Sequence, residues 1–144
     1  MLGMIIALIS GALMSIQGVL NTQLTKQTSV WVSNSWVQFS ALIICLGAWA
    51  VTDRKSFAML WQVEHKYVLL GGIIGAFITL TVILSMKNLG PAQAALLIVV
   101  AQLAVAYVIE LFGWFDMEKA QFSWVKLVGL LIAVGGITLF QLKK

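Results

Sequence analysis

Five long apolar runs, separated by short polar stretches, dominate the pattern of this 144-residue chain. An α-helix needs about 20 consecutive apolar residues to cross the ~30 Å hydrocarbon core of a bilayer. Each run is close to that length. The pattern therefore predicts five transmembrane helices in a single transmembrane domain, residues 1–144. We place them at residues 3–22, 31–51, 68–86, 91–112 and 124–141.

Composition supports an all-α integral membrane protein. Hydrophobic residues make up 61% of the chain and charged residues 10%, whereas soluble proteins average roughly 45–50% and 25%. The mean hydropathy is +1.01. The formal net charge of +4 is spread over several loops and the C-terminal end, so we interpret it as a signal of membrane topology and expect no nucleic-acid partner.

Polar side chains recur on one face of each of the first two predicted helices. Ser10, Gln17 and Asn21 follow helical spacing in the first, and Asn34 and Gln38 share a face of the second. Such residues either join helices by hydrogen bonds, at about 0.6 kcal/mol each, or line a wet cavity. Both interpretations stay open, and all five residues are candidates for contact with a substrate.

The fourth predicted helix is a long apolar run with one charge, Glu110. Gln102, Ala106 and Glu110 recur every four residues and so lie on one arc of the helix. At 1.5 Å per residue, Gln102 lies roughly 16 Å from Pro91, near the bilayer midplane, and Glu110 lies roughly 9 Å inward of Asp116. Ionisable residues within membrane helices often serve proton relays. Alternatively, so shallow a carboxylate simply meets water or pairs with a loop lysine.

Aromatic and small residues give two further expectations. Trp36 and Tyr107 are candidates for the wall of a cavity, and aromatic faces attract cations. Gly71 and Gly75 repeat at a spacing that allows close helix packing. Gly129 and Gly136 lie with Ala133 on a small face of the last helix, which we interpret as a packing or dimer surface.

The sequence offers little for catalysis. It has no His/Cys cluster for a metal, no glycine loop that cradles phosphate, and no combination of nucleophile, base and orienting acid. We therefore expect no catalytic residues, no metal site and no cofactor, and we do not expect an enzyme.

Positive charge is balanced across the membrane in the predicted topology. Lys and Arg in short loops set orientation, and here one side holds five against four. The first side has Arg54, Lys55, Lys66, Lys119 and Lys126; the other has Lys26, Lys87, Lys143 and Lys144. A chain without bias can insert both ways. Two opposed copies would give the inverted symmetry common in secondary transporters, so we expect dual topology and an antiparallel homodimer of ten helices.

Several motifs resemble the short, YdcZ-like branch of the drug/metabolite transporter (DMT) superfamily. They are the first helix with Gln17 and Asn21, the runs GGIIGA and LGPAQAALLIVVAQL, IELFG around Glu110, and the last helix GLLIAVGGITLF. The resemblance covers nearly the whole chain and implies five spans, a location in the inner or plasma membrane, and secondary transport of small molecules. One departure is the pair Glu110–Leu111, because the family pattern leads us to expect Asp, often followed by His.

These observations predict a secondary transporter subunit that moves a small organic solute by alternating access. Glu110 is the candidate for coupling to protons or another cation. The expected partners of the protein are membrane lipid and a small-molecule substrate. Two alternatives stay open: a non-transporting scaffold or accessory subunit of a larger complex, and one half of an obligate heterodimeric transporter.

Overall fold

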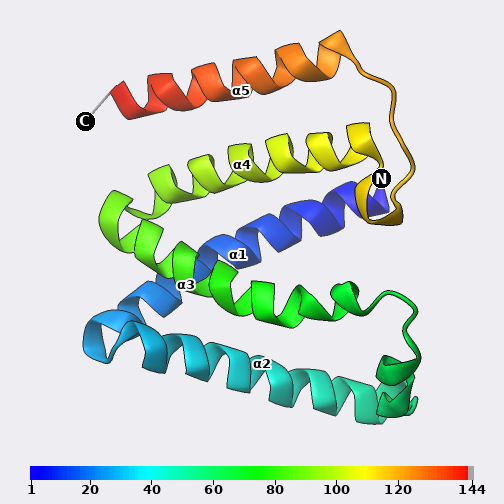
Figure 1. Ribbon diagram of the computed structural model, residues 1–144. Coiled ribbons are helices and arrows are strands. Elements are labelled where there is room, and N and C mark those ends of the chain that lie inside the picture. Colours follow the sequence, from blue (N-terminus) through cyan, green and yellow to red (C-terminus); the bar gives the residue numbers. More distant parts are fainter. Residues whose placement is uncertain (143–144) are drawn as a thin grey trace. The chain divides into compact units, whose positions relative to one another are not determined.

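The computed structural model describes residues 1–142, and it is helical throughout, with no strand in that range (Figure 1). The all-α prediction is confirmed. The chain forms two compact units, Met1–Asn88 and Leu89–Lys144, and each is described by itself. Lys143 and Lys144, which enter the charge balance, lie outside the described residues.

The first unit contains three long helices, α1 (Leu2–Gln27), α2 (Val30–Thr52) and α3 (Gly71–Leu89). Two 3-10 helices, η1 (Phe57–Gln62) and η2 (Lys66–Leu70), lie between α2 and α3. The first helix was predicted to end at residue 22 but runs on to Gln27. The polar side chains beyond residue 22 do not end it, because Thr25 is buried in the unit. The next helix starts where Ser29 accepts a hydrogen bond from the Val32 N–H at 3.2 Å, as an N-cap does.

The core of the first unit lies where the C-terminal half of α1 meets α2 and α3. Ser33 is fully buried and donates a hydrogen bond to the Asn21 carbonyl at 3.0 Å. Ile83 and Met86 of α3 are also buried, and Met86 lies directly against Gly18. Gly18 thus allows α1 and α3 to approach closely, the device expected for helix packing in lipid. Residues 2–17 of α1 are exposed.

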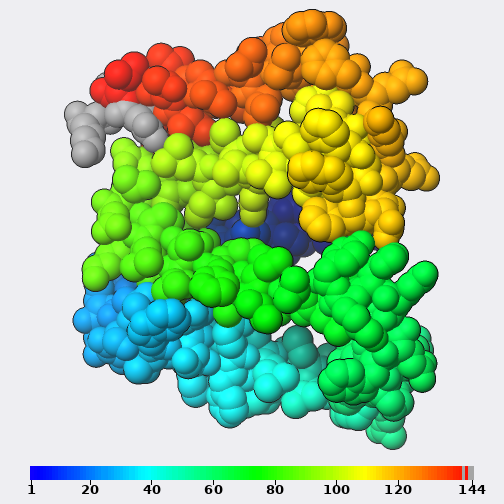
Figure 2. Space-filling view, in the orientation of Figure 1, coloured from blue at the N-terminus to red at the C-terminus, as the bar shows by residue number. Residues whose placement is uncertain are grey.

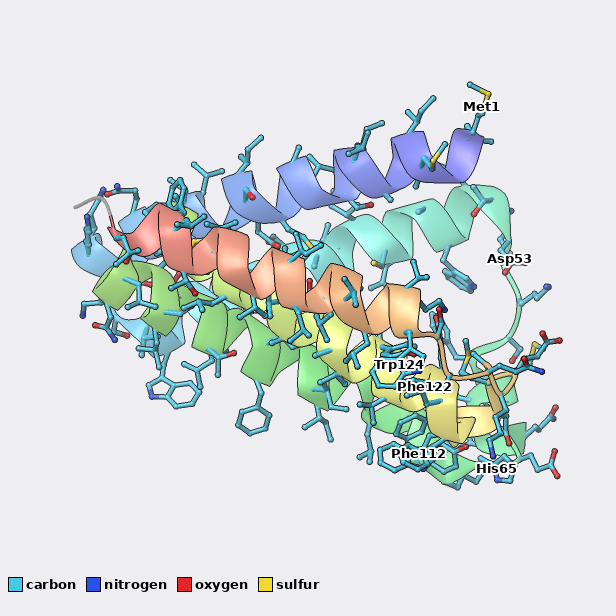
Figure 3. All side chains as sticks on the ribbon, turned by 90° about the horizontal axis from the view of Figure 1, so that it is seen from above. Met1, Asp53, His65, Phe112, Phe122 and Trp124 are labelled. Atoms are coloured by element: carbon cyan, nitrogen blue, oxygen red, sulfur yellow. The ribbon has the colours of Figure 1, made fainter. Side chains whose placement is uncertain are left out.

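The second unit contains α4 (Pro91–Phe112), the short η3 (Trp114–Asp116) and α5 (Trp124–Leu142). The bounds of α4 match the prediction. Gly90, with φ of 84°, precedes Pro91 at the first helical position, and Gly113 ends the helix in the left-handed region with φ of 66°. α5 returns antiparallel to α4 and packs along it (Figures 1 and 2). At its start, Phe122 and Trp124 meet edge to face, 5.2 Å between ring centroids (Figure 3).

Within the described residues, four helices are long and apolar enough to cross a membrane. They are Leu2–Gln27, Val30–Thr52, Lys66–Leu89 (η2 and α3 together) and Pro91–Phe112. α5 is apolar as well but shorter, Trp124–Phe140 by the same criterion. A fifth span therefore stays a prediction.

Candidate functional site

The polar face predicted for α1 lines an open groove against α2. Gln17 and Asn21 lie there with Trp36, Ser40 and Cys45 of α2, around a space of about 520 Å³. Trp36 is exposed, so its ring forms part of the groove wall without filling it. The structure thus brings together three of the sequence-predicted residues. Ser10 lies further along α1 and shares a second shallow groove with Gln17.

Asn34 and Gln38 bind α3. The Asn34 amide donates to the Ala76 carbonyl at 3.1 Å, and the Gln38 amide donates to the Thr79 hydroxyl at 3.2 Å and to Asn34 Oδ1 at 3.4 Å. Asn34 is buried. These contacts are the hydrogen-bonded helix joint that the sequence left as one of two interpretations, and a role in substrate contact stays a prediction.

In the second unit, Tyr107 ties the end of α4 to the start of α5. Its hydroxyl accepts a hydrogen bond from the Ser123 N–H at 2.9 Å and donates one to the Ser123 carbonyl at 3.2 Å. Ser123 also begins α5, because its carbonyl accepts from the Leu127 N–H at 3.1 Å. With both hydrogen-bonding functions of its hydroxyl engaged, the buried Tyr107 ring is held in a fixed position.

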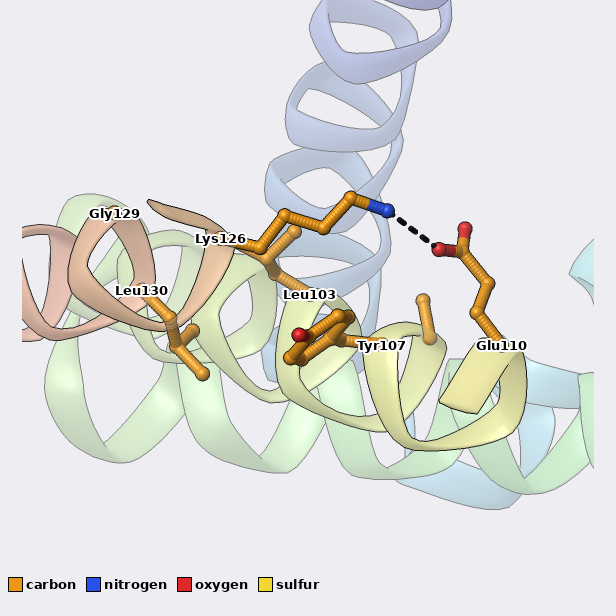
Figure 4. A pocket seen from close by; sticks show the side chains of 7 residues that line it. Leu103, Tyr107, Glu110, Lys126, Gly129 and Leu130 are labelled. Carbon is orange, nitrogen blue, oxygen red and sulfur yellow. Dashed lines mark hydrogen bonds and ion pairs between the residues drawn. The ribbon is translucent and has the colours of Figure 1, made fainter. Parts of the chain in front are cut away.

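Glu110 forms an ion pair with Lys126 of α5. The Lys126 ammonium donates to Glu110 Oε2 at 3.0 Å and lies 5.5 Å from the centroid of the Tyr107 ring (Figure 4). The two side chains are 44% and 53% exposed, respectively. The pair is therefore accessible from outside the chain. Glu110 Oε2 thus has a lysine partner, as one of its two interpretations held, although the lysine lies in α5 and not in a loop.

The register of the two helices explains how this pair forms. The Ala120 N–H donates to the Glu110 carbonyl at 2.8 Å, so residues 110 and 120 lie opposite each other, as do 107 and 123. In an antiparallel pair, Lys126 then lies level with residue 104 of α4, six residues from Glu110 along the axis, or roughly 9 Å at 1.5 Å per residue. Helical side chains tilt toward the N-terminus of their helix, and Lys126 reaches back along this direction, over Tyr107, to Glu110.

A cavity of about 290 Å³ opens beside this ion pair. Glu110, Lys126 and Tyr107 line it together with Leu103, Ala106, Gly129 and Leu130. Ala106 and Glu110 share the wall as their spacing predicted. Gln102, on the same arc, is exposed and is not among the lining residues.

Lys126 is the residue that sequence reasoning undervalued, because it was counted only as a topology charge. The available signal was a lone cation in the first turn of an apolar helix that follows a helix with a lone acid. Pairing of the two would lower the cost of placing both charges in membrane helices.

Within the described residues, the four glycines predicted to mediate packing have no other helix packed closely against them. A Cβ atom added at Gly71, Gly75, Gly129 or Gly136 would meet nothing within 4 Å, other than each helix's own backbone. These positions are open to lipid or to another chain, and their packing role stays a prediction. Gly18 makes the close approach instead.

Comparison with known proteins identifies the family. The family model described as "Putative inner membrane exporter, YdcZ" matches residues 2–139. The chain belongs to the YdcZ family of DMT transporters. No curated protein and no solved structure matches it.

Family membership and the apolar helices together make this a multi-pass protein of the inner membrane with a transporter-like role. The YdcZ-like resemblance and the predicted location are confirmed. Exporters are generally not enzymes, and the absence of catalytic activity in this chain stays a prediction.

Proposed function

We propose that this YdcZ-family chain is one half of a secondary active exporter. Two copies in opposite orientations would form a ten-helix homodimer that moves a small organic solute by alternating access. The observation that carries the proposal is the Glu110–Lys126 pair at a cavity between α4 and α5. The family description favours the outward direction of transport.

Glu110 is the group proposed to couple transport to protons. A proton taken up by its carboxylate gives a neutral acid and releases the Lys126 ammonium from its ion pair. Loss of the proton restores the pair. Because the pair joins α4 to α5, the protonation state of Glu110 changes how firmly these two helices are held beside the cavity. An intramembrane carboxyl group that exchanges protons in this way is typical of pumps and transporters.

Two features support an antiparallel dimer. Loop charge is balanced between the two predicted sides, and a Cβ atom added at Gly129 or Gly136 of α5 would meet nothing within 4 Å in the described part of the chain. In such a dimer the partner copy's acidic residue would come to about the membrane depth of Gln17 and Asn21. Each end of the shared path would then hold one carboxylate and one amide cluster, and the two ends would be equivalent gates.

Proton-coupled flux in proteoliposomes tests the role of Glu110. Reconstituted protein is exposed to panels of amines, quaternary ammonium salts and amino acids, and a pH-sensitive dye reports proton movement. Glu110→Gln is expected to abolish coupled flux while the protein still assembles. Glu118→Gln, a loop variant that removes the same charge, is the matched control and should retain flux. Unchanged coupling in Glu110→Gln would exclude Glu110 from the mechanism.

Labelling from one side of the membrane tests the dimer. In a Cys45→Ser background, Gln27→Cys and Gln62→Cys place single thiols beyond opposite ends of α2. An impermeant maleimide added to intact cells should label about half of each variant if both orientations occur. Full labelling of one variant and none of the other would rule out the antiparallel homodimer and favour a heterodimer.

A further inference from the structure

The position of the Lys126 ammonium defines a small site with its own ligand preference. Its nitrogen lies 3.0 Å from a carboxylate oxygen of Glu110 and 5.5 Å from the centroid of the Tyr107 ring. A carboxylate and the face of an aromatic ring are the two groups that bind ammonium ions in proteins. The Tyr107 hydroxyl is fully engaged by Ser123, so the ring presents its π face and has no hydroxyl proton to offer an anion.

We propose that Glu110 and Tyr107 form a binding site for an organic ammonium ion, and that the Lys126 ammonium occupies this site until the ligand displaces it. The proposal rests on the transport function above and assigns the substrate class of that same cavity. The lysine side chain is a four-carbon chain ending in an ammonium. It is therefore a tethered analogue of the ligand.

The remainder of the cavity suits the hydrocarbon part of such a ligand. Leu103, Ala106, Gly129 and Leu130 contribute apolar surface beside the ion pair. Both charged side chains are about half exposed, so an incoming ammonium can reach the carboxylate as Lys126 leaves. When the ligand binds, its ammonium takes the place of the Lys126 ammonium beside Glu110. The carboxylate therefore keeps one cationic partner throughout.

Removing the tethered competitor should tighten ligand binding by a calculable factor. Ion pairs between partly exposed side chains favour the paired over the open form by a factor of roughly 1.5 to 5. For a ligand that binds only the open form, the dissociation constant is larger than its intrinsic value by a multiple equal to one plus this factor. Lys126→Ala should therefore lower the dissociation constant for an ammonium ligand roughly two- to sixfold. Lys126→Arg keeps a cation in place and should give no such gain.

The experiment is a ¹⁹F NMR titration of 4-fluorobenzylammonium onto the full-length protein in nanodiscs of phosphatidylglycerol. Nanodiscs of the same lipid without protein correct for partition into lipid and for attraction of the cationic probe to the anionic surface. We expect saturable binding to wild type, tighter binding to Lys126→Ala, and loss of binding in Glu110→Gln. An unchanged dissociation constant in Lys126→Ala, or intact binding in Glu110→Gln, would overturn the proposal.

A zwitterionic ligand tests whether Lys126 competes with the ligand for Glu110 or itself binds the ligand. If Lys126 instead served to bind a carboxylate of the ligand, 4-fluorophenylalanine would bind wild type better than 4-fluorobenzylammonium does and would weaken in Lys126→Ala, which would also overturn the proposal. A measurement on wild type guards against variants that fail to fold. With ¹⁵N-labelled lysines, the ammonium resonance that is absent from Lys126→Arg should shift as the ligand displaces it, and no shift at saturation would contradict displacement.

Two further measurements distinguish a lipid headgroup from a soluble amine as the source of the ammonium, and distinguish failure of the transport proposal from failure of this one. In nanodiscs that also contain phosphatidylethanolamine, weaker probe binding would assign the site to a lipid headgroup, whereas equal binding would assign it to a soluble amine. Binding is measured at equilibrium without a proton gradient. Ammonium binding without coupled flux would therefore refute only the transport function, and coupled flux without ammonium binding would refute only this inference.

Discussion

Gly18→Ala tests the close contact between α1 and α3. A Cβ atom at position 18 would lie 2.5 Å from Met86 Cε, 2.6 Å from Met86 Sδ and 3.3 Å from Val82 Cγ1. Real Cβ atoms essentially never come within 3.0 Å of another heavy atom. Met86 is only 5% exposed, so its terminal methyl cannot move aside without disturbing the core of the first unit.

The magnitude follows from the cost of overpacking, about 1–3 kcal/mol for added methyl or methylene groups in a packed core. The clashing atoms are the end of a flexible side chain, so we expect the lower part of that range, about 1–2 kcal/mol. Gly11→Ala is the matched control, because it makes the same change in α1 where a Cβ meets nothing within 4 Å. The effect of the new methyl group on the helix backbone is common to both variants, so the difference between them measures the contact.

Unfolding by sodium dodecyl sulfate in mixed micelles, followed by circular dichroism and tryptophan fluorescence, gives the free energy of unfolding. Gly18→Ala should unfold at a lower detergent fraction than Gly11→Ala. In a Met86→Ala background most of the difference between the two glycine substitutions should disappear, because the two closest atoms are gone and only Val82 Cγ1 at 3.3 Å remains. Equal stabilities of Gly18→Ala and Gly11→Ala in the otherwise wild-type chain would refute the close approach of α1 and α3.

Two hydrogen-bond deletions probe the joints between helices by the same unfolding assay. Tyr107→Phe removes both bonds to Ser123 and should cost about 1 kcal/mol, at roughly 0.6 kcal/mol per bond; a wild-type unfolding midpoint would mean that the tie contributes nothing. Asn34→Leu removes the bond to Ala76 and the acceptor of the bond from Gln38, and it buries an apolar side chain, so we expect a loss of about 0.6–1.2 kcal/mol. A gain in stability would show that Asn34 is kept for a purpose other than packing.

Local signals in the sequence predicted helix ends well where special residues mark them. Both ends of α4 were correct because Gly90–Pro91 and Gly113 leave the backbone few alternatives. The end of α1 was wrong because polarity was taken to end the helix. Thr22 and Thr25 are instead buried in the unit, and the Thr22 hydroxyl is satisfied by the Gly18 carbonyl at 2.7 Å.

The site was predictable only in part. Helical spacing placed Ala106 and Glu110 on one wall, and it singled out Glu110 as the charge that needs an explanation. Helical spacing alone did not point to Lys126, because the antiparallel register places residue 120 opposite Glu110. Only the length and backward tilt of the lysine side chain bring the charges together. The contact of Asn34 with Ala76, 42 residues away, depends likewise on tertiary packing, which no local pattern encodes.

The pairing of Glu110 with Lys126 also bears on how the chain enters the membrane during synthesis. In the proposed five-span arrangement, α4 and α5 each carry one charge near the ends that their connection joins, and an unpaired charge in a membrane helix is costly. The partners are 16 residues apart and joined by a short connection, so they can meet before either helix is released into lipid. α4 and α5 are therefore suited to leave the translocation channel together as a neutral helical hairpin. A nascent chain that stops before Trp124 carries the acid without its counterion.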